Sequence, residues 1–290
     1  MTHRTAPLLM ALAGAILFCG GMVFWLARGL VSSASSTGQN PSLMEILDDV
    51  RRGQPAPTGS PKPAPQPPAQ PPWRSPLTNA CSAPDPGLSQ RLRDQYAMLN
   101  RRVQRINIHP SNYSERHKQD AFGNRINPKP RVVVLHETVY GLGSAINTFV
   151  TPHLQDDDQV SYHMLIGEDG RIIQALDPSK RAFGAGNSAF DGEWAITNPK
   201  ARGSINNFAL HLSLETPVDG ENNALGHSGY SQAQYDALAL VLAKWMMSYN
   251  ISAENITTHR HVDLGGERAD PRSFNWNELK ERLIALGVLC

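Results

Sequence analysis

The amino-acid sequence predicts a mixed α/β domain in which helices pack on a central β-sheet. Residues 131–135 read Arg-Val-Val-Val-Leu, a run typical of a buried strand. A Gly-Glu-Asp-Gly turn at 167–170 separates two apolar stretches, which favours a hairpin. Residues 231–249 carry apolar side chains at the spacing of an amphipathic helix. Alternating strand and helix signals of this kind favour an α/β architecture.

The expected elements follow from the same patterns along the chain. Ser231 and Gln234 predict a capping box at the start of the long helix. Residues 208–215 alternate between apolar and other side chains, which predicts a strand. In chain order we expect a helix at 88–106, strands at 131–135, 160–166, 171–176 and 208–215, a helix at 231–249, a strand at 256–258 and a helix at 276–286.

The N-terminal third of the chain has a different character from the rest. Residues 7–27 carry no charge and are about long enough to cross a bilayer, so we expect residues 1–30 to be an uncleaved signal-anchor, with a cleaved signal peptide as the alternative. Twelve of the 22 prolines fall between residues 53 and 87. Residues 31–80 are therefore expected to be a polar, Pro-rich linker whose stretch 55–76 would span roughly 70 Å as a polyproline-II spacer. The folded domain is expected at 81–290.

Charge and cysteine content exclude several classes of protein. Lys+Arg 27 against Asp+Glu 26 gives a net charge of +1, without the basic excess of a nucleic-acid-binding protein. The 3 cysteines exclude a disulfide-dense scaffold and Cys-rich zinc clusters.

Two histidines and an aspartate stand where a rigid element would aim them. His136 directly follows the strand expected at 131–135, and His259 directly follows the short strand at 256–258. Asp270 lies eleven residues after His259, in a Gly-rich loop. Two imidazoles and one carboxylate would leave an open fourth position on a tetrahedral Zn²⁺, as catalytic zinc sites do. Taken singly, each histidine is more often structural, and His261 competes with His259 as a ligand.

The order of five short motifs narrows the set of protein families that the chain can resemble. VVVLHET, VSYHMLIGEDGRI, NNFALHLSLET, ITTHRHVD and RADPRSF occur in this order within residues 131–283. Together they resemble the zinc-dependent N-acetylmuramoyl-L-alanine amidases, which are related to phage lysozyme-type amidases and peptidoglycan recognition proteins. The resemblance covers about half of the chain.

The resemblance implies a role for individual residues. It implies Zn²⁺ as cofactor, with His136, His259 and Asp270 as its ligands. It implies that Glu215 accepts the proton of the attacking water and that Tyr162 supplements or replaces it. His261, like Tyr162, is a candidate donor to the oxyanion.

Three positions depart from the family pattern. Arg268 stands where the family has a lysine, and Arg272 stands where it has a glycine after Asp-Pro. Arg268 remains the candidate that stabilises the oxyanion, although arginine and lysine are not equivalent there. Gly184 replaces the histidine of a His-Ala-Gly motif in the substrate groove. Asn187 and Ser188, next in that loop, are the remaining candidates for substrate binding.

The expected function is hydrolysis of the amide between the muramoyl lactyl group and L-alanine of peptidoglycan. The expected partners are peptidoglycan or muropeptides and, through the N-terminal segment, a membrane, but not nucleic acid. The alternatives are a non-catalytic peptidoglycan-binding module and a zinc peptidase acting on related amides. An exported chain would be anchored in the inner membrane or secreted to the periplasm.

The chain termini of the expected domain supply a first testable prediction. Cys81 and Cys290 flank the domain, and an exported chain would bring both into an oxidising compartment, so we predict a Cys81–Cys290 disulfide. The chain-entropy model gives it at most about 4–5 kcal/mol of stabilisation. Non-reducing mass spectrometry of the exported protein should show no alkylatable thiol at either position. Two free thiols per chain, or a reducible dimer, would contradict the prediction.

Overall fold

A six-stranded sheet with the strand order β1-β5-β4-β7-β3-β8 forms the centre of the protein. The structure is a computed structural model that describes residues 60–78 and 83–289. All neighbouring strands run parallel except the antiparallel hairpin β4–β5. The strands are β1 (Val103–Arg105), β3 (Val132–Glu137), β4 (Met164–Ile166), β5 (Ile172–Gln174), β7 (Ala209–Leu214) and β8 (Ile256–Thr258). A separate antiparallel pair joins β2 (Tyr113–Glu115) and β6 (Lys180–Ala182).

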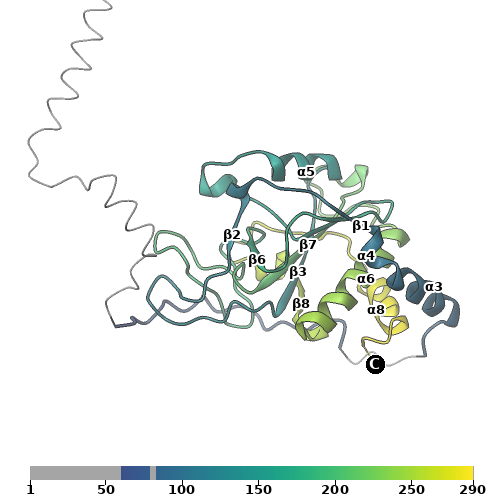
Figure 1. Cartoon of the computed structure of the whole chain (residues 1–290), viewed down its shortest axis with the longest axis horizontal. Coiled ribbons are helices and arrows are strands. Elements are labelled where there is room, and N and C mark those ends of the chain that lie inside the picture. Colours follow the sequence, from purple (N-terminus) through teal and green to yellow (C-terminus); the bar gives the residue numbers. More distant parts are fainter. Residues whose placement is uncertain (1–59, 79–82, 290) are drawn as a thin grey trace, which may run out of the picture. The chain divides into compact units, whose positions relative to one another are not determined.

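Helices cover both sides of this sheet, which confirms the predicted fold class (Figure 1). On one side, α3 (Pro86–Ala97), α6 (Gln232–Tyr249) and α8 (Trp276–Ala285) contact one another and enclose the largest apolar core. On the other side, α5 (Leu142–Val150) packs through Leu142 and Phe149 against Leu165 and Ile173. Two short helices, α4 (Leu99–Arg102) and α7 (His259–Val262), complete the described set.

Strand alternation decides which residues share a face with His136. In β3, Val133 and Leu135 belong to the core under α6, whereas Val132 and Val134 belong to a core on the opposite side. Successive side chains of a strand point to opposite faces, so His136 lies on the side of Val134. The same reasoning places His211 and Ser213 of β7 on that side, because the leucines that flank them all face α6.

Most predicted elements are confirmed, and the first helix is wrong in its last part. The single helix expected over 88–106 is divided at Met98 into α3 and α4, and after α4 Val103 pairs with Ile172 as part of strand β1. The apolar side chain of Val103 suits either a helix face or a strand, and pairing with β5 determines which one forms. The capping box of α6 is confirmed, with both hydrogen bonds between Ser231 and Gln234 present. Helices α5 and α7 and the β2–β6 pair were not predicted from the sequence.

The Pro-rich segment differs from the predicted free spacer. Residues 60–78, which we call the strap, lie against the domain and belong to the same compact unit. The Lys62 N–H donates to the Phe122 carbonyl at 3.0 Å, and the Trp194 indole N–H donates to the Pro65 carbonyl at 2.9 Å. Proline lacks an N–H, but its carbonyl still accepts, so a Pro-rich segment can be held by donors of another element.

The second half of the strap is fixed to α7 and to the main core. The Gln70 side-chain amide donates to the carbonyl of His261 at 3.2 Å, and the rings of Trp73 and His261 lie 4.6 Å apart. The Ser75 hydroxyl donates to the Ala253 carbonyl at 2.9 Å. Leu77 is 1% exposed within the core that α6 and α8 enclose. The folded part of the chain therefore includes residues that the sequence assigned to the linker.

The predicted signal-anchor and the predicted disulfide lie outside the described residues. The segment 1–30 and both Cys81 and Cys290 fall in this category. Within residues 60–78 and 83–289, no helix combines the length and the apolar character that a membrane crossing requires.

The burial of Leu77 predicts that the strap contributes to the stability of the domain. Leu77→Ala should lower the free energy of unfolding by about 2–5 kcal/mol, because truncation of a buried leucine removes apolar contacts and leaves a cavity. Leu154→Ala is the matched control, since Leu154 is 91% exposed. Denaturant unfolding of both variants measures the difference. Equal stability of Leu77→Ala and the unsubstituted chain would mean that the strap is a free linker after all.

Candidate metal centre

Three side chains from three separate segments meet at the ends of β3 and β8. One ligand atom each of His136, His259 and Asp270 lies within 4.8 Å of the others. The Nδ1 atom of His136 is 3.2 Å from Oδ2 of Asp270, and Nδ1 of His259 is 3.0 Å from its Oδ1. His136 is fully buried, whereas the Asp270 side chain remains 16% exposed. The structure thus brings together all three predicted metal ligands.

Local structure explains why these side chains converge. β3 pairs with β8 in parallel, so the chain leaving β8 enters α7, with His259 as its first residue, next to the end of β3. The loop after α7 returns because the Asp263 carboxylate accepts backbone N–H groups of Gly265, Glu267 and Arg268 at 2.7–3.1 Å. The N–H of Arg260 then donates to the carbonyl of Asp270 at 2.9 Å, which fixes Asp270 beside His259.

The protonation states of the cluster suit a divalent metal. Burial lowers the pKa of His136 to about 4 against the opposing hydrogen bond of Asp270, so its imidazole is neutral at pH 7. Burial alone would raise the pKa of Asp270, but hydrogen bonds with His136 and His259 outweigh it and hold the pKa below its usual range. Imidazole nitrogens and a carboxylate are ligands that Zn²⁺ takes, and three of them leave one position open. The donor set therefore fits a catalytic zinc ion.

Tyr162 lies directly against this cluster. Its ring stacks on the ring of His136, with centroids 4.3 Å apart and an interplanar angle of 21°, and Phe149 contacts it edge-on at 5.5 Å. Burial raises the pKa of the Tyr162 phenol above its usual value, and the negative charge of Asp270 adds to this effect. The phenol therefore keeps its proton at neutral pH and is available as a hydrogen-bond donor.

Arg268 and His261 differ in their relation to the cluster. Arg268 is exposed on the loop before Asp270, and its positive charge is close enough to contribute to the lowering of the His136 pKa. His261 contacts Trp73 of the strap with its ring tilted by 44° and is not among the residues whose ligand atoms converge. The geometry thus favours His259 over His261 as the ligand from this segment.

Comparison with known proteins agrees with this geometry. The sequence profile of the N-acetylmuramoyl-L-alanine amidase family matches residues 126–273, just over half of the chain. The chain belongs to this family. All three residues of the cluster lie inside the matched range.

Individual relatives are similar over part of their length. The 1,6-anhydro-N-acetylmuramyl-L-alanine amidase AmpD of Salmonella typhimurium (strain LT2) is 31% identical over 129 residues, which are 44% of this chain and 59% of AmpD. AmpD of Escherichia coli (strain K12) is 33% identical over 120 residues, 41% of this chain and 55% of AmpD. This chain thus spans less than two thirds of the curated relatives it matches.

Solved structures are similar to about 60% of this chain. A crystal structure of a selenomethionine AmpD derivative has 24% identity and a TM-score of 0.47, covering 63% of this chain and 94% of that one. The amidase AmiD from E. coli, in complex with anhydro-N-acetylmuramic acid-L-Ala-D-γ-Glu-L-Lys, has 22% identity and a TM-score of 0.42, covering 59% and 65%.

Glu215 lies one residue beyond strand β7, where it caps a helix. Its Oε1 accepts the N–H of Leu142, which begins α5, at 2.6 Å, and its Oε2 accepts the N–H of Glu168 at 2.8 Å. The residue paired with His136 on β7 is Ser213. Among the described residues, no hydrogen bond or ion pair joins Glu215 to the metal cluster. The role of Glu215 as proton acceptor stays a prediction. Its hydrogen bonds to two backbone N–H groups hold the start of α5 and the turn at Glu168.

The two predicted substrate-binding residues also occupy different environments. Ser188 is fully buried, and its hydroxyl donates to the Ala185 carbonyl at 2.8 Å and accepts the N–H of Ile205 at 3.1 Å. These hydrogen bonds give it a structural role in place of the predicted substrate contact. Asn187 is half-buried, and its carbonyl accepts the N–H of Leu264, so it borders the loop that leads to Asp270. A substrate contact through Asn187 stays a prediction.

A buried ion-pair cluster beside the site was not predicted from the sequence. Glu137, the neighbour of His136 on the opposite sheet face, binds the Arg272 guanidinium, the Tyr230 hydroxyl and Nε2 of His227. Arg272 also donates to three carbonyls of the loop 220–224, at 2.6–2.9 Å. The arginine that replaces the family glycine therefore anchors the long connection between β7 and α6. No local sequence signal joins residues that are so far apart.

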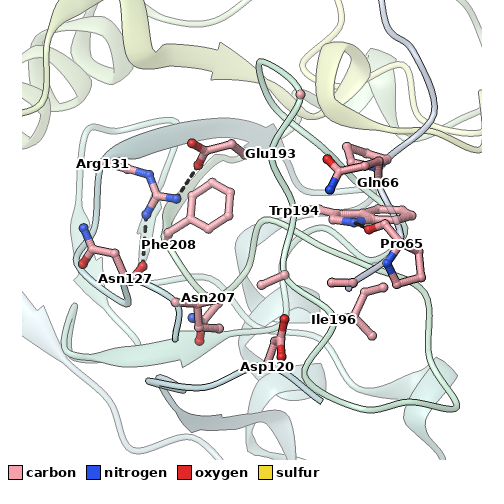
Figure 2. Close-up of a pocket in the computed structure, with 15 residues that line it drawn as sticks. Pro65, Gln66, Asp120, Asn127, Arg131, Glu193, Trp194, Ile196, Asn207 and Phe208 are labelled. Carbon is pink, nitrogen blue, oxygen red and sulfur yellow. Dashed lines mark hydrogen bonds and ion pairs between the residues drawn. The ribbon is translucent and has the colours of Figure 1, made fainter. Parts of the chain in front are cut away.

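A cavity between the strap and the rest of the domain is separate from the metal cluster (Figure 2). It has a volume of about 250 Å³ and is lined by residues that include Pro65, Trp194 and Arg131, but by none of the metal cluster. Arg131 pairs with Glu193 at 2.5 Å and lies 3.9 Å above the ring of Phe208. The charges of Arg131 and Glu193 are therefore paired with each other within the chain.

The contacts of Glu215 lead to a prediction that separates its two roles. Glu215→Gln places an amide NH₂ group against a backbone N–H, so a capping role predicts a loss of about 1–3 kcal/mol in stability with little change in the catalytic rate. Thermal unfolding and kcat of the same preparation measure both quantities. A 10²–10⁴-fold lower kcat at unchanged stability would instead establish Glu215 as the general base.

Proposed function

We propose that the chain hydrolyses the amide bond between the N-acetylmuramoyl lactyl group and L-alanine in peptidoglycan or in muropeptides derived from it. The observation that carries this proposal is the convergence of His136, His259 and Asp270 within 4.8 Å of one another. Family membership and the names of the AmpD relatives support the choice of substrate.

The three ligand residues would hold a zinc ion, which supplies a water of pKa about 7 and polarises the scissile carbonyl. Asp270 and His259 are kept in place by the loop after α7, and His136 by the rigid strand β3. The Tyr162 phenol, protonated at neutral pH and stacked on His136, would donate a hydrogen bond to the oxygen on which negative charge develops. Arg268 adds a positive charge at the exposed rim.

Two alternative functions are compatible with the same fold, namely binding of peptidoglycan without hydrolysis and hydrolysis of a different amide bond. A peptidoglycan-binding module without activity needs no complete ligand set, so the presence of all three ligands favours an enzyme. A zinc peptidase would use the same cluster on another amide, and the shape of the substrate groove would decide between the two bonds. The products of the reaction separate these functions.

We also propose that the domain acts in the cell envelope. The uncharged segment 7–27, as a membrane anchor or an export signal, supports this location. Since the strap is folded onto the domain, the connection to such an anchor would run through residues 31–59 alone.

The test is digestion of purified sacculi and of soluble anhydromuropeptides, with mass spectrometry of the products. The unsubstituted, zinc-loaded chain should release peptides with a free L-alanine amine and leave an intact lactyl acid. His136→Ala and Asp270→Ala should abolish activity and lower zinc content, because each removes one of three ligands. His153→Ala, which alters a histidine remote from the cluster, should retain both.

Two results would contradict the proposal in different ways. Cleavage inside the stem peptide would indicate the zinc peptidase. Bound zinc and peptidoglycan binding without any product would indicate the non-catalytic module.

A further inference from the structure

The two ring nitrogens of His136 face different partners. Nδ1 lies 3.2 Å from Oδ2 of Asp270, on the side of the metal cluster. Nε2 lies 3.0 Å from Nδ1 of His211, inside the protein. His211 comes from the neighbouring strand β7 and is 0% exposed, so it can contact neither substrate nor solvent in this conformation. The contact between the two imidazoles is the only hydrogen bond that the described residues offer to His136 Nε2.

A hydrogen bond between two neutral imidazoles has a direction, and the direction decides whether His136 can bind a metal. If His211 donates, His136 must carry its proton on Nδ1, where it faces Asp270 and blocks a metal ion. If His136 donates through Nε2, its Nδ1 lone pair is free for a metal. Metal-binding histidines generally fix this choice through a partner of the other nitrogen, usually a carboxylate or a backbone carbonyl.

The surroundings of His211 fit the role of acceptor. His211 is fully buried, and no carboxylate is among its hydrogen-bond partners in the described residues, so burial favours the neutral ring. Its Nε2 atom is buried without a partner among the described residues. A neutral ring with its proton on Nε2 presents a lone pair at Nδ1, which is the atom that faces His136.

His163 fixes the backbone of His211, and the His211 ring fills the space beside Gly184. The backbone N–H of His211 donates to Nδ1 of His163 at 3.0 Å, and its carbonyl accepts the N–H of His163 at 2.9 Å. A Cβ atom at Gly184 would lie 2.4 Å from Nδ1 of His211, so a side chain at position 184 would displace the ring. The glycine that replaces the histidine of the family motif thus provides the space that His211 fills.

We propose that His211 is a positioning residue for the metal centre: it accepts the Nε2–H of His136 and thereby keeps Nδ1 of His136 free for the metal. This inference rests on the proposed function, because it assumes that His136 is a metal ligand. A neutral imidazole in this place orients the ligand without adding negative charge behind it, which a carboxylate would do.

The proposal is tested by zinc affinity in the full-length protein, measured by competition with a chromogenic chelator. His211→Leu fills a similar volume but offers no hydrogen-bond acceptor to His136, and it should weaken zinc binding about ten- to hundredfold. His211→Asn offers an amide oxygen near the position of Nδ1 and should retain most of the affinity. Should the leucine variant fail to fold, His211→Ala provides the same comparison.

A matched control excludes a general effect of removing a buried polar group. Thr257 lies on β8, on the other side of β3, and its buried hydroxyl also has no partner among the described residues. Thr257→Val should leave zinc affinity unchanged. Thermal unfolding of each metal-free variant shows whether its fold is intact.

A second readout reports the direction of the hydrogen bond itself. In the zinc-loaded protein, ¹⁵N spectra of the histidine rings should show His211 with its proton on Nε2 and an acceptor at Nδ1. A proton on Nδ1 of His211 would overturn the proposal. So would wild-type zinc affinity in His211→Leu, or equal losses in His211→Leu and Thr257→Val.

Failure of the proposed function gives a different result. If the unsubstituted chain binds no zinc, the metal centre and this inference both fall. If it binds zinc and hydrolyses the amide while His211→Leu binds zinc equally well, the inference alone is overturned.

Discussion

Parallel pairing of β3 with β7 on one side and β8 on the other is the constraint on which the site depends. The pairing aligns Val134 with both His211 and Thr257, so the end of β3 is enclosed by two neighbouring strands. His136 therefore lies beside the polar side chains of His211, Ser213 and Thr257 on its face of the sheet. A shift of β3 by one residue would turn His136 toward α6 and away from Asp270. The buried Val133 and Leu135 of β3 make such a shift costly, because they too would change faces.

The polar face around His136 costs the fold some stability, and the proposed metal centre would offset part of this cost. His211 Nε2, Ser213 Oγ and Thr257 Oγ1 are all buried without a partner among the described residues, and all lie on this face. An unsatisfied buried polar atom costs about 1–3 kcal/mol. A metal that binds only the folded state returns stability in proportion to its concentration and affinity. The metal centre and the stability of this part of the sheet are thus linked.

Local patterns were sufficient to predict the parts of the fold that depend on short segments. The strand ending in His136, the hairpin at 167–170 and the capping box of α6 follow from neighbouring residues. The strap could not be predicted, because it depends on Trp194 and α7, far along the chain. The partner of His136 escaped for the same reason: alternation places His211 on the correct face, but the space left by Gly184 appears only in three dimensions. Asp270 could be predicted as a ligand because its motif consists of neighbouring residues in the sequence. Its position in the fold nevertheless depends on the hydrogen bonds of Asp263.

The register of β7 also limits how protons can be handled at the site. Ser213, and not a carboxylate, is paired with His136, while both oxygens of Glu215 accept backbone N–H groups at the start of α5 and at Glu168. The group that does lie against the cluster is the Tyr162 phenol, whose raised pKa makes it a donor at neutral pH and a poor base. Stabilisation of developing negative charge by a fixed donor is therefore the contribution that the nearest side chain can make.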